Sequence, residues 1–285
     1  MAFWRDRIIA PSVIGMATLS AWAGGAMAED LPPTGQPHPW QFGFQPPATP
    51  VMDDIERFHG DLVLPIITVV ALFVLALLVT VVVRFNSTKN PVPSRVTHHT
   101  GLEIAWTVIP ILILVVIAIP SFRLLYFQQV LPQADMTIKA TGAQWYWSYE
   151  YPDNGGISFD ANMIQEADLK PGQPRLLAVD NEVVVPINKV VRVQVTGADV
   201  IHSFAVPSFG IKIDAVPGRL NETWFKATRE GVFYGQCSEL CGTKHAFMPI
   251  AIRVVSDADF TSWVSTKKAE MDGRSSSKVA SAAAN

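Results

Sequence analysis

Two thiols, an imidazole and a thioether lie within twelve residues near the C-terminal end of this 285-residue chain. The stretch begins at Cys237, continues through Cys241 and His245, and ends at Met248. These two cysteines are the only ones in the sequence, so both fall in a segment that also holds other ligand types. Sulfur and imidazole donors at this spacing form a ligand set for a soft metal ion.

A disulfide is the simplest alternative, because an exported protein with two cysteines most often pairs them. A disulfide would leave His245 and Met248 without explanation, whereas a metal site uses all four side chains. His202 is the best candidate for a further ligand, because an imidazole is unexpected in the apolar, strand-like run that surrounds it.

The softness and number of the donors favour copper over zinc. Zinc sites built on cysteine usually close with Cys or His ligands and exclude thioethers, whereas a His-Cys-His-Met set is typical of copper. A single copper needs one thiolate, so the second cysteine indicates two copper ions bridged by both sulfurs, each also bound by one histidine. Met248 and the backbone carbonyl of Glu239 would fill the weak axial positions.

A β-domain is predicted to position these ligands. From about residue 131 the sequence changes to short alternating or β-branched runs between Pro and Gly turns, a pattern typical of a sandwich or barrel. Ligands on an inner strand and on a loop between two late strands resemble the cupredoxin arrangement, a Greek-key barrel. The predicted strands are Met136 to Thr141, Trp145 to Tyr151, Val190 to Thr196, Val200 to Val206, Glu222 to Ala227, Val232 to Gln236 and Ile250 to Val255.

The end of the chain predicts a short helix and then a tail. Ser256 and Asp259 form a capping box ahead of an apolar stripe, which indicates a helix that closes the domain. The domain is therefore predicted to cover residues 131–272. Residues 273–285, rich in Ser and Ala, are predicted to be disordered.

Two charge-free apolar runs, Leu62 to Val83 and Ile104 to Phe122, are long enough to cross a bilayer, which takes roughly 20 residues. The loop between them carries Arg84, Lys89 and Arg95, while the segment before the first run is rich in Asp and Glu. Basic residues stay on the cytoplasmic side. The sequence therefore predicts a transmembrane hairpin over residues 62–130 with both ends on the exported side.

Residues 1–28 predict a cleaved secretory signal, because Arg5 and Arg7 precede a moderately apolar stretch that ends in Ala26-Met27-Ala28. A first transmembrane helix is the weaker alternative, since Pro11 and Gly15 interrupt the stretch. Residues 29–61 are then an exported N-terminal segment. The predicted signal and the charge pattern of the hairpin both place the N-terminal segment on the exported side.

The charge of the chain indicates the kind of partner. Residues 131–260 hold 15 acidic against 11 basic side chains, a net charge of −4 that would steer a basic partner toward the domain. A nucleic-acid partner is not expected, because the sequence has no basic stripe. Phosphate-binding glycine loops and nucleophilic triads are not found either.

The motifs resemble one known family. The run from Gly235 to Gly242, with His245 and Met248 behind it, is similar to the binuclear copper (CuA) loop of subunit II of haem-copper cytochrome c oxidases. The resemblance extends to Gln144–Tyr151, His202–Ser208, Asp214–Arg219 and Leu102–Trp106, and covers nearly all of residues 50–265.

This resemblance implies the subunit of a respiratory oxidase in a bacterial inner membrane, with its copper domain in the periplasm. The copper pair would take electrons from cytochrome c and pass them to haem in the catalytic subunit I. Oxygen would be reduced to water there, coupled to proton pumping. The haem would belong to the partner subunit, since this chain has no C-x-x-C-H sequence.

The resemblance also assigns roles to Trp145 and Glu103, which are not copper ligands, and a second role to Glu239. Trp145 would be the point where electrons enter, in a surface ringed by carboxylates such as Asp199. The Glu239 side chain would bind a magnesium ion shared with the catalytic subunit. Glu103 would stand at the mouth of a proton pathway, although a carboxylate at that position also caps a helix.

Other classes of protein fit less well. A quinol oxidase subunit lacks the copper ligands, and nitrous oxide reductase is a much longer soluble protein with a propeller domain. The remaining alternative is a membrane-tethered copper-delivery or thiol-redox protein. Such a protein needs an exposed site and has no use for the aromatic run or for Glu103.

Overall fold

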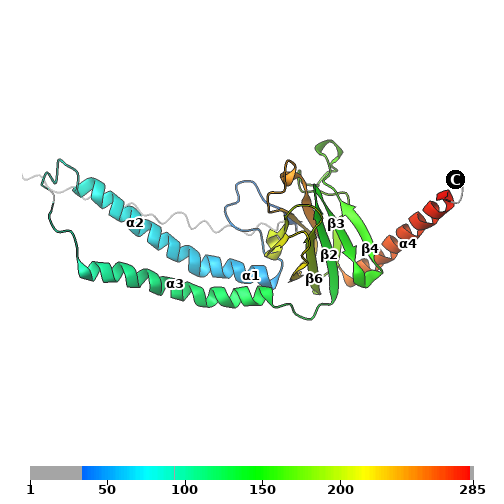
Figure 1. Ribbon diagram of the computed structural model, residues 1–285, viewed down its shortest axis with the longest axis horizontal. Helices are drawn as coiled ribbons and strands as arrows, with labels where there is room; N and C mark the ends of the chain where they lie inside the picture. The colour runs from blue at the N-terminus through cyan, green and yellow to red at the C-terminus, as the bar shows by residue number, and fades with distance from the viewer. Residues whose placement is uncertain (1–33, 93, 283–285) are drawn as a thin grey trace, which may run out of the picture. The chain divides into compact units, whose positions relative to one another are not determined.

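The computed structural model describes residues 34–92 and 94–282 (Figure 1). The predicted signal, residues 1–28, lies outside the described residues. Within them, a helical hairpin precedes a domain of β-strands and a last helix. The fold class that the sequence predicts, a membrane hairpin followed by an all-β domain, is confirmed.

The first membrane helix begins earlier than predicted. It starts as α1 (Pro50–Arg57), continues through a π-helical turn (Phe58–Val63) and becomes α2 (Leu64–Arg84), so the helical segment runs over 35 residues. Thr49 caps it, because its side-chain oxygen accepts a hydrogen bond from the Met52 N–H and Pro50 occupies the first turn. Hydropathy finds the apolar core of such a helix but not its polar first turns.

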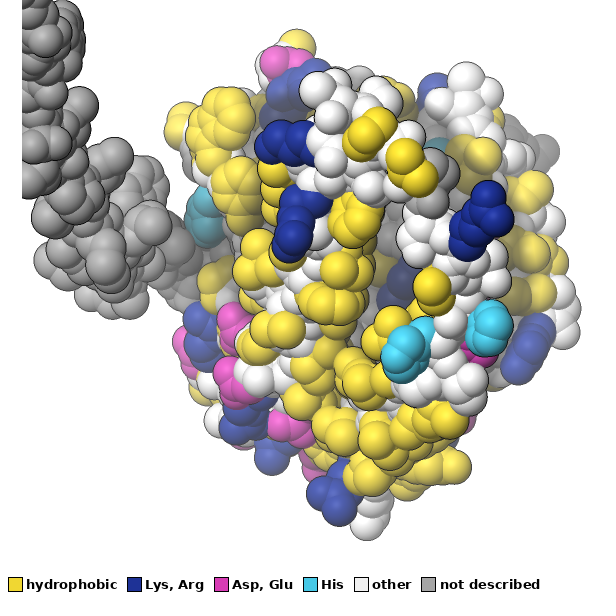
Figure 2. Space-filling model, turned by 90° about the vertical axis from the view of Figure 1, so that its left-hand side faces the viewer, with side chains coloured by type: hydrophobic (Ala, Val, Ile, Leu, Met, Phe, Trp, Pro, Cys, Tyr) yellow, Lys and Arg dark blue, Asp and Glu magenta, His cyan; other side chains and the backbone are white. Residues whose placement is uncertain are grey.

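The second membrane helix, α3 (Thr100–Gln129), extends beyond the predicted run of 104–122 at both ends. No residue of α2 or α3 is buried, and both helices expose large apolar side chains along their length. Figure 2 shows how hydrophobic side chains cover much of the face that it views. Such surfaces are suited to lipid or to partner helices rather than to water.

The β-domain consists of two sheets with a common core. One sheet has the order β5 (Val183–Pro186), β11 (Pro249–Val255), β10 (Gly231–Cys237), β7 (His202–Val206) and β8 (Ile211–Ala215), and β1 (Thr34–Gly35) pairs with the first half of β10. The other has the order β4 (Ile157–Ala161), β3 (Tyr146–Tyr151), β2 (Met136–Ala143), β6 (Val190–Gly197) and β9 (Asn221–Lys226). The strands thus form a sandwich with crossovers between non-consecutive neighbours.

All seven predicted strands are present, with ends shifted by one or two residues. Four further strands were not predicted: β1, β4, β5 and β8. The bulkiest fully buried side chains fill the space between the sheets: Trp147, Tyr149, Tyr151, Phe204, Phe209, Phe225 and Phe233. This core keeps the ends of β7 and β10 in fixed positions.

The closing helix α4 runs from Asp257 to Ala282 and is longer than predicted. Ser256 caps it, since its Oγ accepts a hydrogen bond from the Asp259 N–H and donates one to the Asp259 carboxylate. Trp263 packs against Tyr151, with ring centroids 5.1 Å apart. Residues 273–282, predicted to be disordered, continue the helix to Ala282, and no proline interrupts them.

Candidate metal centre

Two adjacent strands bring His202 and Cys237 together. β7 and β10 are antiparallel neighbours, with Phe204 opposite Cys237. β7 begins at His202 and β10 ends at Cys237, so both residues lie at the same end of the sheet. The pairing continues one residue further, because the Ser238 N–H donates to the Ser203 carbonyl at 3.0 Å.

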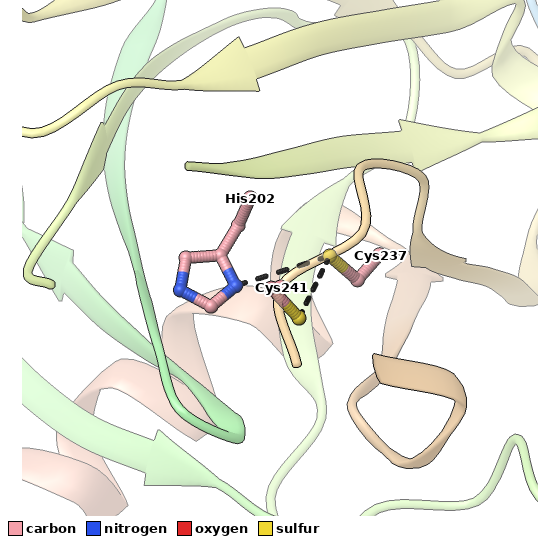
Figure 3. Close-up of side chains that lie close together, drawn as sticks. All are labelled: His202, Cys237 and Cys241. Carbon is pink, nitrogen blue, oxygen red and sulfur yellow. Dashed lines mark hydrogen bonds between the residues drawn. The ribbon is translucent and has the colours of Figure 1, made fainter. Parts of the chain in front are cut away.

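The donor atoms of His202, Cys237 and Cys241 face one another (Figure 3). They lie within 4.8 Å of each other, and all three residues are buried. The Cys237 Sγ lies 3.9 Å from the His202 Nδ1 and 3.9 Å from the Cys241 Sγ. The sulfurs are therefore too far apart for a disulfide, whose bond length is about 2.05 Å, and both cysteines are free.

The other three predicted donors join this group. The Cys241 Sγ lies 3.6 Å from the His245 Nδ1 and 3.5 Å from the Met248 Sδ. On the other side, the Cys237 Sγ lies 3.3 Å from the Glu239 carbonyl oxygen. The loop after β10 thus turns back so that the two sulfurs stand between two imidazoles, a thioether and a carbonyl.

The donor set fits copper ions on the chemistry of its contacts. Each sulfur contacts one imidazole and one weak donor, a thioether or a carbonyl, which are ligand types that copper accepts. Burial and the neighbouring Cys237 thiol raise the pKa of Cys241 to about 12, so this group is a neutral thiol near pH 7 in the protein alone.

Asp199 supports His202 from behind. Its carboxylate lies 2.8 Å from the His202 Nε2 and also accepts the backbone N–H groups of Gln144 and Val200. Burial raises the pKa of Asp199, but these hydrogen bonds outweigh it and lower the pKa below its usual value. A carboxylate that fixes the far nitrogen of a ligand histidine orients the ring toward the metal. Asp199 was predicted to be a surface carboxylate, and its side chain is 35% exposed; its bond to His202 was not predicted.

Gly142 supports the same ring from the side and was not predicted. A Cβ at this position would lie 2.9 Å from the Cβ, Cγ and Cδ2 atoms of His202. Real side chains essentially never come so close, so the imidazole occupies space that only a glycine leaves free. The sequence gives no signal for this contact, because the two residues are 60 positions apart.

Trp145 lies against the cysteine loop. It is partly buried, and its indole N–H donates to the Cys241 carbonyl at 3.3 Å. The Gln144 side-chain amide donates to the same carbonyl at 2.7 Å. Trp147 is fully buried and donates to the Met248 carbonyl at 3.3 Å. Two neighbouring tryptophans therefore hold the loop at a cysteine and at a methionine.

Glu239 and Glu103 differ in their surroundings. The Glu239 side chain is exposed at the tip of the cysteine loop. Glu103 belongs to α3, where its carboxylate accepts the His99 N–H at 3.1 Å while the His99 Nδ1 accepts the Leu102 N–H at 3.2 Å. This reciprocal pair is the capping that the sequence analysis gave as the alternative role of Glu103.

Comparisons with known proteins agree with this geometry. The family model described as cytochrome C oxidase subunit II, periplasmic domain, matches residues 136–255, and that for the transmembrane domain matches residues 37–124. A probable cytochrome c oxidase subunit 2 of Rickettsia bellii is 56% identical over 245 residues, which cover 86% of this chain and 91% of that protein. The subunit 2 of Cereibacter sphaeroides is 48% identical over 264 residues, 86% of each chain.

A solved structure is also similar to the C-terminal half. It is the periplasmic domain of subunit II of cytochrome oxidase of Bradyrhizobium japonicum, with 70% sequence identity. The match covers 50% of this chain and 99% of that one, with a TM-score of 0.47.

Proposed function

Because this chain belongs to the cytochrome c oxidase subunit II family, we propose that its cysteine loop holds the two copper ions through which the subunit transfers electrons. The chain is part of a haem-copper terminal oxidase, and it passes electrons from cytochrome c to subunit I. The observation that carries the copper assignment is the continuous set of contacts from His202 through Cys237 and Cys241 to His245.

The proposed ligands are the two bridging thiolates, the His202 and His245 imidazoles, the Met248 thioether and the Glu239 carbonyl. Two bridged copper ions would share one electron, so bond lengths change little when the site is reduced. The chain contributes a rigid site for this chemistry. Its cysteines and Met248 are buried, Asp199 and Gly142 fix one imidazole, and two indoles hold the loop.

Trp145 is the proposed acceptor of electrons from the donor protein. Two features support this role: its ring is partly exposed, and its N–H is bonded to the carbonyl of a proposed bridging cysteine. An electron that arrives on the indole is therefore one hydrogen bond away from the cysteine backbone. The net charge of −4 over residues 131–260 favours a basic cytochrome c as the donor.

Glu239 and Glu103 receive further proposed roles. The free, exposed carboxylate of Glu239 is an oxygen donor of the kind that magnesium prefers, and a partner subunit would complete that site. Glu103 lies at the loop end of α3, which the basic loop assigns to the cytoplasmic side, and there it would admit protons to subunit I. The haem groups would belong to the partner subunit, and a bacterial inner membrane is the proposed location.

Replacement of either cysteine by serine tests the copper assignment. Cys237→Ser and Cys241→Ser each remove one bridge, so we expect the copper-loaded β-domain to lose the hyperfine pattern of an electron shared by two nuclei. Paramagnetic resonance and absorption spectra measure this directly. An unchanged spectrum in either variant would refute the assignment. Met248→Leu is the matched variant, because loss of a weak axial ligand should shift the reduction potential and keep both coppers.

The same samples distinguish the alternative of a copper-delivery or thiol-redox protein. A delivery site must release copper to an acceptor chelator at a useful rate, whereas an electron-transfer site retains it. We expect the wild-type domain to keep both copper ions during prolonged exposure to a chelator, because the proposed ligands are largely buried.

A further inference from the structure

A cavity of about 500 Å³ lies between the start of the first membrane helix and the end of the second. Its wall combines two guanidinium groups, Arg57 and Arg123, and the Asp54 carboxylate with apolar side chains such as those of Phe58, Leu62 and Leu124. The cavity lies outside the copper domain, and the proposed electron-transfer function makes no use of it.

The positions of the two apolar runs place both arginines at the expected depth of lipid headgroups. Arg123 directly follows the charge-free run of α3. Arg57 lies five residues before Leu62, where the other charge-free run begins. Five residues of a helix span about 7.5 Å. The headgroup layer on each side of the hydrocarbon core is roughly 5 to 8 Å thick. The apolar wall residues Leu62 and Leu124 border the hydrocarbon side of this layer.

The charges on the cavity wall leave one unit of positive charge uncompensated. Arg57 forms an ion pair with Asp54 at 2.6 Å. Arg123 has neither a hydrogen bond nor an ion pair with any residue in the described part of the chain. Asp53, Glu56 and Asp61 are on the same helical segment, but they do not line the cavity. An unpaired guanidinium at the mouth of an apolar cavity is complementary to a phosphate diester.

We propose that this cavity binds one phospholipid of the exported leaflet, with a phosphodiester headgroup of net charge −1 between Arg123 and Arg57. Its acyl chains would lie against Leu62, Leu124 and Phe58. A phospholipid matches both halves of the wall, whereas a free phosphate would use the arginines alone and leave the apolar half without a ligand.

Native mass spectrometry of the assembled oxidase tests the site. The complex is stripped of lipid with detergent and titrated with dioleoylphosphatidylglycerol, with dioleoylphosphatidylcholine and inorganic phosphate as separate probes. We expect Arg123→Gln to lose one retained phosphatidylglycerol and to weaken its binding by about tenfold or more, because a hydrogen bond to a charged group contributes at least that factor. Arg84→Gln, at the other end of α2, is the matched control and should keep the lipid.

Three results would overturn the lipid proposal. Equal retention of phosphatidylglycerol by the wild type and Arg123→Gln overturns the proposal, and so does a wild-type complex that binds none because a partner subunit covers the cavity. Inorganic phosphate that displaces the lipid completely would show a simple anion site instead. If Arg123→Gln does not assemble, Arg123→Lys and Arg57→Gln replace it: the first should retain the lipid and the second should lose it. Copper spectra of each sample report assembly independently of lipid binding.

Discussion

Three neighbours define the position of the His202 imidazole. Asp199 bonds its Nε2, Gly142 leaves the space for one face of its side chain, and Cys237 stands 3.9 Å from its Nδ1. The imidazole is therefore oriented toward the sulfur by Asp199, three residues before it, and by the space at Gly142 of β2. A ligand that its surroundings hold in one orientation moves little when a bound metal changes its redox state, and fast electron transfer requires this property.

Gly142→Ala tests whether this space matters. The added methyl group would lie 2.9 Å from three atoms of His202, so the His202 side chain or the backbone of β2 must shift. We expect a loss of about 1 to 3 kcal/mol in stability, as for other overpacked cores, together with an altered copper spectrum. Gly43→Ala is the control, since a Cβ there meets nothing within 4 Å. A native spectrum in Gly142→Ala would show that His202 has room to spare.

Trp145→Phe tests the route of the electron. Phenylalanine retains a ring at the surface but loses the N–H that bonds the Cys241 carbonyl. We expect electron transfer from reduced cytochrome c to slow greatly in stopped-flow measurements, while the affinity for cytochrome c and the copper spectrum stay nearly constant. Trp106→Phe, exposed on α3, should behave as the wild type. Equal rates in the Trp145 and Trp106 variants would exclude the proposed route.

The elements differ in how far the sequence predicts them. The ligand loop is local, since five of its six donors lie within residues 237–248, and spacing alone was sufficient to identify it. Gly142 acts on His202 through the tertiary structure from 60 positions away, so its role could not be found from local pattern. Asp199 is only three residues before His202, but the spacing alone does not show that its carboxylate bonds the imidazole. β5 was missed because its four buried residues show no alternation. β4 and β8 are short strands of five residues, and only the first and last residue of each is buried. The sequence signal of these strands is therefore weak.

Glu103→Gln separates the two roles of Glu103, which are capping of α3 and the proposed entry of protons. The amide oxygen of glutamine can still accept the His99 N–H that the carboxylate accepts now, so the cap should persist at a cost below about 1 kcal/mol. Glutamine cannot carry a proton. We expect normal assembly and normal electron transfer to copper, but slower steady-state oxygen consumption. Normal oxygen consumption in the fully assembled variant would leave capping as the only role of Glu103.

At the scale of the whole β-domain, two buried tyrosines make stability depend on pH. Burial raises the pKa of Tyr149 and of Tyr151 above the ordinary value near 10. The folded state therefore holds these protons more tightly than the unfolded state does. Their contribution to stability is complete below about pH 10 and falls as the pH rises above that value. We expect the midpoint of thermal unfolding to decrease steadily above pH 10.

Phenylalanine at each position gives the matched comparison. The Tyr149 hydroxyl is buried without a hydrogen-bond partner in the described structure, so Tyr149→Phe should be neutral or stabilising and should reduce the loss at high pH. The Tyr151 hydroxyl donates to the Val184 carbonyl and accepts the Val184 N–H. Tyr151→Phe should therefore cost about 1 to 3 kcal/mol at neutral pH. Identical unfolding curves for the two variants would contradict this account.

The short strand β1 pairs with a strand that is synthesised much later. Thr34 and Gly35 pair with Val232 and Phe233 of the strand that ends at Cys237. Gly35 lies so close that a Cβ there would stand 2.6 Å from the Phe233 ring. At about 5 to 20 residues per second, the ribosome makes β10 some 10 to 40 seconds after β1. The first strand must therefore wait for its partner strand while both membrane helices and most of the domain are made. Pairings this distant also form slowly, so we expect metal to enter only after the last strands have been made and paired.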